Sequence, residues 1–297
     1  MNMIQSTGVC TALVTPFLNN EVNYPMMEQL LRRQMSAGIP AVVIAGTTGE
    51  GSVLSDSEKL ELFRRAKAFV GNMMQILAGT CSNDTDHAIR LSREAEQCGV
   101  DGLLVVSPYY NKATTSGLTE HYRRIAESVN IPILLYNVPS RTGLDMPVEV
   151  YRQLSQIPNI AGVKEAVTDV RKLIRIRQVC GPNFQIWCGN DDLAAAMLAL
   201  GARGVISVVS NLLPEKMQQL CYAALTGDAA RALSVQTDLQ PVLDALFHDV
   251  NPAPIKYAML LAGYDCGSCR LPVGEISKET EQLLRKILYS SNNCILS

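Results

Sequence analysis

The sequence has few of the features that mark membrane, secreted or nucleic-acid-binding proteins. No apolar run approaches the ~20 residues that a membrane-spanning helix needs. Residues 1–10 contain no basic segment followed by an apolar one, so we expect no secretory signal. The 26 lysine and arginine residues nearly balance the 28 aspartate and glutamate residues, and this balance provides no positive field for nucleic acid or an anionic membrane. The composition therefore argues against both kinds of partner.

Histidine and paired cysteine, the usual ligands of zinc, are also scarce. The three histidines, His87, His121 and His248, are dispersed along the chain. The nine cysteines are scattered, and the close pair Cys266 and Cys269 has neither a second such pair nor two histidines nearby, which argues against a zinc site. An odd, unclustered set of cysteines without a signal peptide is typical of reduced thiols. We therefore expect a cytoplasmic protein without a bound metal.

What the sequence does contain is a regular alternation of short apolar runs and longer amphipathic segments. The amphipathic segments 24–36, 55–70 and 85–98 have apolar residues at helical spacing, and Ser55 with Glu58 predicts a capping box. The apolar runs, rich in β-branched residues, predict eight buried strands. These runs cover residues 8–15, 41–45, 75–80, 102–107, 131–137, 160–166, 184–189 and 204–209.

Strands that alternate with helices predict a parallel sheet with helical crossovers. Eight strands that are apolar almost throughout favour a closed barrel over an open sheet, and no glycine-rich dinucleotide-binding turn follows the first strand. We predict an α/β fold, a (β/α)8 TIM barrel over residues 1–225. A C-terminal helical region over residues 226–297 is expected to pack on the barrel, because no flexible linker separates the two. The last predicted helices cover residues 212–225, 228–247, 252–261 and 277–289.

One predicted strand, 160–166, carries a lysine at position 164. Side chains alternate along a strand, so Gly162, Lys164 and Ala166 share one face, and the two small residues leave space around the amine. Burial lowers the pKa of an ammonium group, and the neutral amine can then attack a carbonyl to form a Schiff base. The alternative interpretation is a lysine whose stem is buried and whose amine reaches water.

Polar side chains gather at the carboxyl ends of the predicted strands, where the active sites of such barrels lie. A phenol on this rim can move protons for the amine, and an arginine there can pair with a substrate carboxylate. The turn 46–49 can present backbone N–H groups and hydroxyls to another carboxylate. Each feature also has a simpler interpretation, as a capped turn, a strand aromatic or a solvated arginine. The residues are Thr47, Thr48, Tyr109, Tyr110, Tyr136, Arg141, Lys164, Gly189 and Asn190.

Two adjacent acids, Asp191 and Asp192, follow the seventh predicted strand. Aspartate is a preferred residue at helix N-termini, so we predict that they cap the helix that follows. They are assigned no catalytic role.

Several longer motifs resemble a known family over residues 8–272. The motifs are 46–50 (GTTGE), 108–112 (PYYNK), 136–143 (YNVPSRTG), 162–166 (GVKEA), 204–208 (GVISV) and 251–252 (NP). They resemble the pyruvate-dependent class I aldolase family, which includes N-acetylneuraminate lyase and dihydrodipicolinate synthase. The motif 136–143 is similar to the synthase branch, because the sialic acid lyases have no arginine at the position of Arg141.

The resemblance implies a reaction and the residues that perform it. Lys164 would condense with the ketone of pyruvate, and the resulting enamine would attack the aldehyde of L-aspartate 4-semialdehyde to give 4-hydroxy-tetrahydrodipicolinate. This is the first committed step of diaminopimelate and lysine biosynthesis. The covalent Schiff base would make a metal or organic cofactor unnecessary. Tyr136, Thr48 and Tyr110 would relay protons, with Tyr110 reaching in from a neighbouring subunit.

The resemblance also implies substrate contacts and an assembly. Thr47 and Thr48 would bind the pyruvate carboxylate, and Arg141 the semialdehyde carboxylate. Ile206, through its main-chain carbonyl, and Gly189 would lie against the substrate. The family is usually a dimer of dimers, so we expect a homotetramer.

Two features depart from the family pattern. Gly51 stands where a serine is common. In lysine-inhibited members a histidine and a glutamate hold the inhibitor in a cleft at the dimer interface, and the corresponding positions here are Lys59 and His87. A cationic lysine repels a bound amino acid's ammonium, and histidine cannot replace the carboxylate that binds it. We therefore hypothesise that feedback inhibition by lysine is weak or absent.

Two other functions remain as alternatives. The first keeps the Schiff base and changes the aldehyde, giving a lyase or aldolase for a sugar acid or hydroxy-oxo acid. Arg141 distinguishes it, because an arginine suits a short substrate with its own carboxylate, whereas a polyol requires hydroxyl partners. The second is a catalytically silent barrel used for binding, since fold alone does not establish function.

Overall fold

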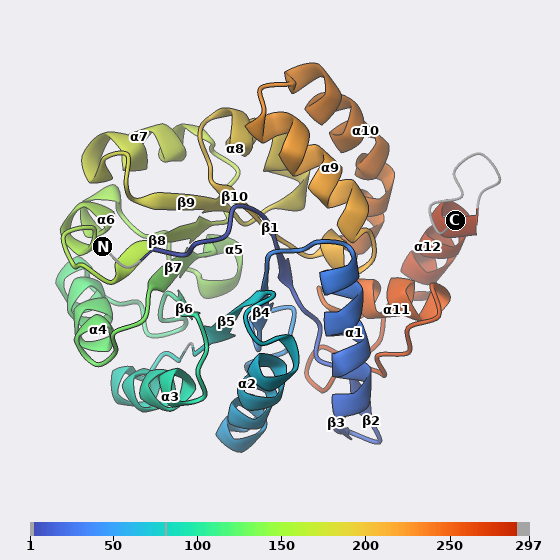
Figure 1. The fold of residues 1–297 in the computed structure, drawn as a ribbon, viewed down its shortest axis with the longest axis horizontal. Coiled ribbons are helices and arrows are strands. Elements are labelled where there is room, and N and C mark those ends of the chain that lie inside the picture. The colour runs from blue at the N-terminus through green and yellow to red at the C-terminus, as the bar shows by residue number, and fades with distance from the viewer. Residues whose placement is uncertain (1–2, 81, 290–297) are drawn as a thin grey trace.

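The protein is a closed barrel of eight parallel strands surrounded by helices, as shown by a computed structural model that describes residues 3–80 and 82–289 (Figure 1). The strands follow the order β1-β10-β9-β8-β7-β6-β5-β4 around the barrel. All eight predicted strands are confirmed, and with them the (β/α)8 class. The barrel strands are β1 (Gly8–Ala12), β4 (Ala41–Ile44), β5 (Gln75–Gly79), β6 (Gly102–Val106), β7 (Ile133–Asn137), β8 (Ile160–Glu165), β9 (Gln185–Cys188) and β10 (Gly204–Ser207).

The helices begin and end close to the residues that their capping signals predict. Ser55 accepts a hydrogen bond from the N–H of Glu58, whose carboxylate accepts one from the N–H of Ser55, so the predicted capping box is present. The helices are α1 (Tyr24–Ser36), α2 (Asp56–Val70), α3 (Thr85–Gln97), α4 (Thr115–Glu127), α5 (Pro139–Thr142), α6 (Val148–Leu154), α7 (Arg171–Cys180), α8 (Ala194–Ala199), α9 (Pro214–Leu225), α10 (Ala229–Leu246), α11 (Ala253–Leu261) and α12 (Lys278–Tyr289).

Four short elements escaped prediction. A hairpin of β2 (Phe17–Leu18) and β3 (Glu21–Val22) precedes α1. Two 3-10 turns, η1 (Asp191–Leu193) and η2 (Val209–Asn211), follow β9 and β10. Elements of two or three residues are too short to show a periodicity.

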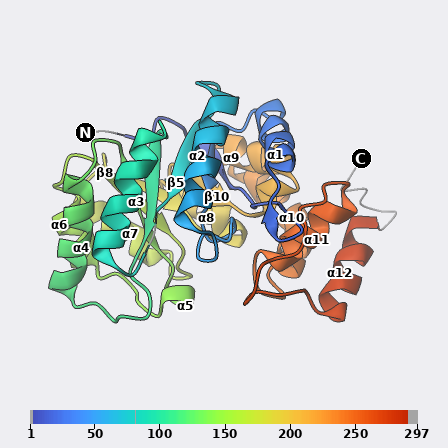
Figure 2. The same ribbon diagram turned by 90° about the horizontal axis from the view of Figure 1, so that it is seen from below.

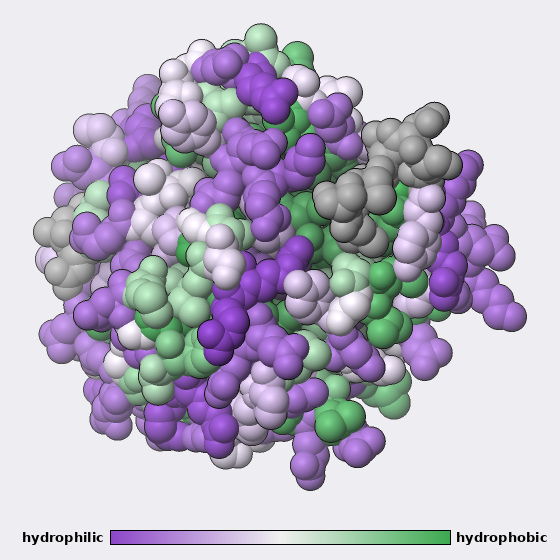
Figure 3. All heavy atoms as spheres, turned by 45° about the vertical axis from the view of Figure 1, so that its right-hand side comes forward, coloured by the Kyte–Doolittle hydropathy of each residue, from purple (hydrophilic) through white to green (hydrophobic). Residues whose placement is uncertain are grey.

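The C-terminal helices lie against one side of the barrel. Helix α10 packs on α9 and α12, and α11 packs on α12. Figure 2 shows α11 and α12 at the end of the molecule away from α4 and α6. The surface at this end is mostly hydrophilic at its edge, with apolar side chains exposed beside it (Figure 3). The boundary predicted between residues 225 and 226 stays a prediction.

Two apolar layers form the core. The larger layer lies between the strands and the surrounding helices. The smaller layer fills the inside of the barrel and includes Trp187, Tyr136, Val106, Val138 and Ile206. None of the described helices is both long and apolar enough to cross a membrane. The cysteines that the structure describes are all unpaired, while positions 81 and 294 lie outside the described residues.

Candidate active site

The centre of the site is the pair Lys164 and Tyr136, on the neighbouring strands β8 and β7. The two residues are partners in the strand register, so both side chains point into the barrel. The Nζ of Lys164 lies 4.4 Å from the centre of the Tyr136 ring, and Lys164 is only 5% exposed. A cation this close to an aromatic face is stabilised by it. The burial favours the interpretation of Lys164 as an enclosed amine over that of a lysine reaching water.

A buried polar network behind these strands holds the pair in place. Glu165, the residue after Lys164, is fully buried and accepts hydrogen bonds from Asn137 Nδ2 at 2.6 Å and the hydroxyl of Tyr151 at 2.8 Å. The ammonium of Lys172 lies 3.5 Å from the same carboxylate. Burial raises the pKa of Glu165. Because Asn137 and Glu165 are also register partners, the network fixes β7 and β8 immediately next to the reactive side chains.

Asp191 is buried as well, and the prediction that it caps the helix after β9 is wrong. Its carboxylate is 2% exposed and accepts hydrogen bonds from the N–H groups of Val208 at 2.8 Å and Val209 at 2.9 Å. It therefore caps the turn η2 after β10. Neither the turn η1 nor the helix α8 that follow β9 has a side-chain cap. Burial raises the pKa of Asp191, while hydrogen bonds from Val209, Ser207 and Val208 and the charge of Lys164 partly offset that shift.

The turn after β4 presents the two predicted threonines. Thr48 is buried and its Oγ1 accepts a hydrogen bond from Asn251 Nδ2 at 3.0 Å. Thr47 is half-buried, and its carbonyl accepts a hydrogen bond from the N–H of Glu50 at 3.1 Å. Hydrogen bonds to the Thr48 hydroxyl and to the Thr47 carbonyl therefore hold this turn. The sequence predicted only that it is a βα turn or a carboxylate site.

A cavity of about 240 Å³ opens beside the turn. Thr47 and Arg141 both line it, so the structure brings these two predicted residues together. Val106 and Val138 line the cavity and also belong to the interior layer that contains Tyr136. The cavity therefore borders the layer of the barrel interior in which the Lys164–Tyr136 pair lies.

Asn251 is a site residue whose role the sequence did not reveal. Its side chain donates to Thr48, its carbonyl accepts a hydrogen bond from Arg141 Nη2 at 3.2 Å, and it lines the cavity. Its Oδ1 is buried and has no hydrogen-bond partner among the described residues. The motif at 251–252 was the only signal, and it carries no information about which residues Asn251 contacts.

The remaining predicted residues differ in their placement. Ile206 is buried in the interior layer opposite Cys10. Gly189 is half-buried, and its N–H donates to the carbonyl of Glu165 at 2.8 Å. Tyr110 is 90% exposed, with φ of 73°. A side chain this exposed packs against almost nothing in its own chain, so a single chain does not bring Tyr110 to the relay.

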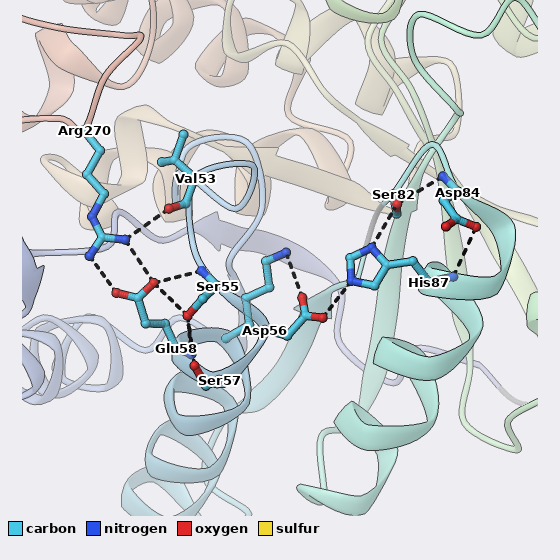
Figure 4. A network of polar contacts seen from close by, with 10 residues as sticks. Val53, Ser55, Asp56, Ser57, Glu58, Ser82, Asp84, His87 and Arg270 are labelled. Atoms are coloured by element: carbon cyan, nitrogen blue, oxygen red, sulfur yellow. Dashed lines mark hydrogen bonds and ion pairs between the residues drawn. The ribbon is translucent and has the colours of Figure 1, made fainter.

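The positions compared above with the lysine-inhibitor cleft form a polar cluster (Figure 4). Asp56 lies between them, with its carboxylate 3.8 Å from Lys59 Nζ and 2.7 Å from His87 Nε2. The other ring nitrogen of His87 lies 3.1 Å from the hydroxyl of Ser82. Asp56 reduces the net positive charge that the hypothesis assigned to this place. The carboxylate is already bound by two basic side chains, however, and offers little to an incoming ammonium.

The chain is similar to known proteins over nearly its whole length. The Dihydrodipicolinate synthetase family matches residues 5–291. The 4-hydroxy-tetrahydrodipicolinate synthase of Acetivibrio thermocellus is 41% identical, over 95% of this chain and 96% of the relative. That of Clostridium novyi is 39% identical, over 98% of each.

Solved structures agree. The crystal structure of dihydrodipicolinate synthase from Aquifex aeolicus has a TM-score of 0.94 at 37% identity, covering 97% of this chain and 98% of the other. A protein described as the first monomeric dihydrodipicolinate synthase variant has a TM-score of 0.93 at 37% identity, covering 96% of this chain and 97% of the other. The chain therefore belongs to the dihydrodipicolinate synthetase family.

Proposed function

We propose that the chain condenses pyruvate with L-aspartate 4-semialdehyde to form 4-hydroxy-tetrahydrodipicolinate, the first committed step of diaminopimelate and lysine biosynthesis. The observation that carries the proposal is the buried amine of Lys164 beside the ring of Tyr136, at the carboxyl end of β8. An enclosed lysine is the group that forms a Schiff base with a ketone. Relatives that match the chain over nearly their whole length are named 4-hydroxy-tetrahydrodipicolinate synthase.

The proposed reaction uses covalent catalysis by Lys164. Its amine adds to the ketone carbon of pyruvate, and loss of water gives an iminium ion. Removal of a methyl proton gives an enamine, which forms the new carbon–carbon bond to the aldehyde carbon of the semialdehyde. The amino group of the bound semialdehyde then attacks the imine carbon, closes the ring and releases Lys164. The Schiff base itself accepts the electron pair, so we propose that the reaction needs no metal or organic cofactor.

Tyr136 and Thr48 are the proposed proton carriers. Because Asn251 donates to Thr48 Oγ1, the hydroxyl hydrogen of Thr48 is directed elsewhere and is available to another acceptor. A phenol next to the amine can both deliver and remove protons during formation and dehydration of the first adduct.

The cavity next to this pair is the proposed binding site for the two carboxylates. Thr47 and Thr48 bind that of pyruvate, and Arg141, which lines the same cavity as Thr47, binds that of the semialdehyde. A guanidinium is well suited to a carboxylate because it can donate two parallel hydrogen bonds. Gly189 and the carbonyl of Ile206 complete the proposed contacts.

We also propose that the active protein is a cytoplasmic homotetramer, a dimer of dimers. The exposure of Tyr110 and its left-handed backbone support an approach from a second subunit, because only a partner can bury this phenol. One relative is described as the first monomeric variant of its kind, which sets it apart from other members.

The test is reductive trapping with pyruvate. Borohydride reduces an iminium ion to a stable amine, so intact mass and peptide mapping are expected to find a reduced pyruvyl group on Lys164. A steady-state assay with aspartate semialdehyde should then show turnover, and sugar acids should not be cleaved. An unmodified Lys164 in folded protein would refute the aldolase chemistry. The catalytically silent binding barrel would then be the remaining interpretation. Trapping followed by cleavage of a sugar acid would refute the choice of aldehyde alone.

A further inference from the structure

The catalytic turn after β4 is held from outside the barrel, by the start of helix α11. Asn251, two residues before α11, donates to the hydroxyl of Thr48. One turn further on, Lys256 Nζ lies 2.6 Å from Glu50 Oε1. The two contacts hold residues 48 and 50 of the same turn. They come from residues 251–256, about two hundred positions later in the sequence.

The ion pair between Lys256 and Glu50 is almost completely enclosed. Their side chains are 3% and 1% exposed. The ammonium also lies 4.3 Å from the centre of the Phe17 ring. Desolvation of two charges costs about as much as their attraction returns, so an apolar pair of similar volume would stabilise the fold as well or better. Stability alone is therefore a poor reason for a charged pair at this place.

Glu50 is fixed by a second partner as well. Its Oε2 accepts a hydrogen bond from the backbone N–H of Arg270 at 2.8 Å. The guanidinium of Arg270 donates to Glu58 and to the carbonyl of Val53 (Figure 4). Two segments of the C-terminal region thus converge on one carboxylate next to the active site.

The backbone shows why this carboxylate needs restraint. Glu50 has φ of 55°, a left-handed conformation that glutamate adopts only when its surroundings impose it. Its N–H donates to the carbonyl of Thr47 at 3.1 Å. If Glu50 relaxed to an ordinary conformation, this bond would break, and Thr47 and Thr48 would move with it.

We infer that Glu50 and Lys256 are positioning residues for the reaction. Their ion pair holds the turn so that Thr47 and Thr48 meet the pyruvate carboxylate and the proton relay. Glu50 lines the substrate cavity, but both of its carboxylate oxygens are already bound, one by Lys256 and one by the N–H of Arg270. The inference rests on the proposed function and deepens it: the start of α11 and the segment at Arg270 support the active site from the C-terminal region.

The test compares a neutral version of the pair with the native chain. Lys256→Met alone leaves a buried carboxylate without its partner and is expected to lower the melting temperature strongly. The double variant Glu50→Gln/Lys256→Met removes both charges and is expected to fold. Lys67→Met is the matched control, because Lys67 pairs with Asp101 at 2.8 Å, and Asp101 directly precedes β6 at the amino end of the barrel, away from the rim.

The expected result is a kinetic defect without loss of the fold. In the double variant, KM for pyruvate should rise and kcat should fall, each by about tenfold or more, since displacements of ~1 Å cost up to 10²-fold. At saturating pyruvate Lys164 should still be trapped by borohydride, because the amine lies on a different strand. Lys256→Arg, which keeps the charge, should recover part of the activity. Lys67→Met should lower the melting temperature and leave both constants near those of the native chain.

Two results would count against these ideas in different ways. A folded double variant with kcat and KM within twofold of the native values would overturn the positioning role and leave the pair as a structural contact. A native chain that gives neither a trapped adduct nor turnover would overturn the proposed function, and this inference with it. The native arm of the experiment therefore separates the two failures.

Discussion

Replacing Gly162 by alanine places a methyl group where the neighbouring strand leaves no space. A Cβ at this position would lie 2.0 Å from the carbonyl oxygen of Gln185 on β9, whereas ordinary contacts begin near 3.4 Å. The two strands would have to separate by roughly the difference, about 1.4 Å, and forced overpacking of this kind costs about 1–3 kcal/mol. Lys164 follows two residues later and pairs in register with Trp187 on the same β9. We therefore expect kcat to fall by up to about 10²-fold, the usual consequence of a displacement near 1 Å in a catalytic group.

The matched control is Gly227→Ala, in the turn between α9 and α10. Gly227 has φ of 87°, and no atom lies within 4 Å of the place that a Cβ would occupy, so alanine meets only backbone strain there, worth about 1–2 kcal/mol. Urea unfolding should show a similar loss of stability in both variants, while reductive trapping and steady-state rates should change only in Gly162→Ala. If Gly162→Ala kept native rates and native stability, the close approach of β8 and β9 would have no bearing on Lys164.

Four further outcomes are expected. Tyr136→Phe should lower kcat by about 10²–10⁴-fold, with the fold intact by circular dichroism; a native rate would remove Tyr136 from the relay. Asn251→Ala should lower kcat in protein that is still folded, since it frees the hydroxyl of Thr48. A native kcat with a lower melting temperature would show that Asn251 has only a structural role. L-Lysine should not inhibit at sub-millimolar concentration, and a steady-state assay that finds such inhibition would contradict the hypothesis. Hydrogen bonding to Arg270 lowers the pKa of Glu58 from 4.5 to about 2, so its contribution to stability is complete above pH 4.5 and is lost as pH falls toward 2; Glu58→Gln should flatten the pH dependence of urea unfolding in that window, and an unchanged slope would refute it.

Local signals account for what the sequence could predict. The strands are continuous apolar runs, and the capping box of Ser55 and Glu58 involves residues three apart, so both can be read without knowing the fold. Active sites of such barrels lie at the carboxyl ends of the strands, which share one edge. This rule placed Thr47, Arg141 and Lys164 at one end of the barrel.

The contacts that escaped prediction depend on which elements become neighbours. Asp191 caps the turn after β10 because β9 and β10 lie side by side, whereas sequence order favoured its own helix. Asn251 meets Thr48 only after the C-terminal helices fold back over the barrel. Asp56 separates Lys59 from His87 through a contact between α2 and α3. In each case the residue type indicated a polar contact, but the sequence did not identify the residue that makes it.

The late position of α11 has a consequence for the chain as it is synthesised. A nascent chain that has emerged only as far as β10 already contains Lys164 and Tyr136, but none of the side chains that hold Thr48 and Glu50. The amine and the turn that would receive a keto acid's carboxylate are thus completed at different times, the second only when residues 251–270 have been made. A chain that ended at β10 would therefore carry the reactive lysine without the contacts that fix this turn.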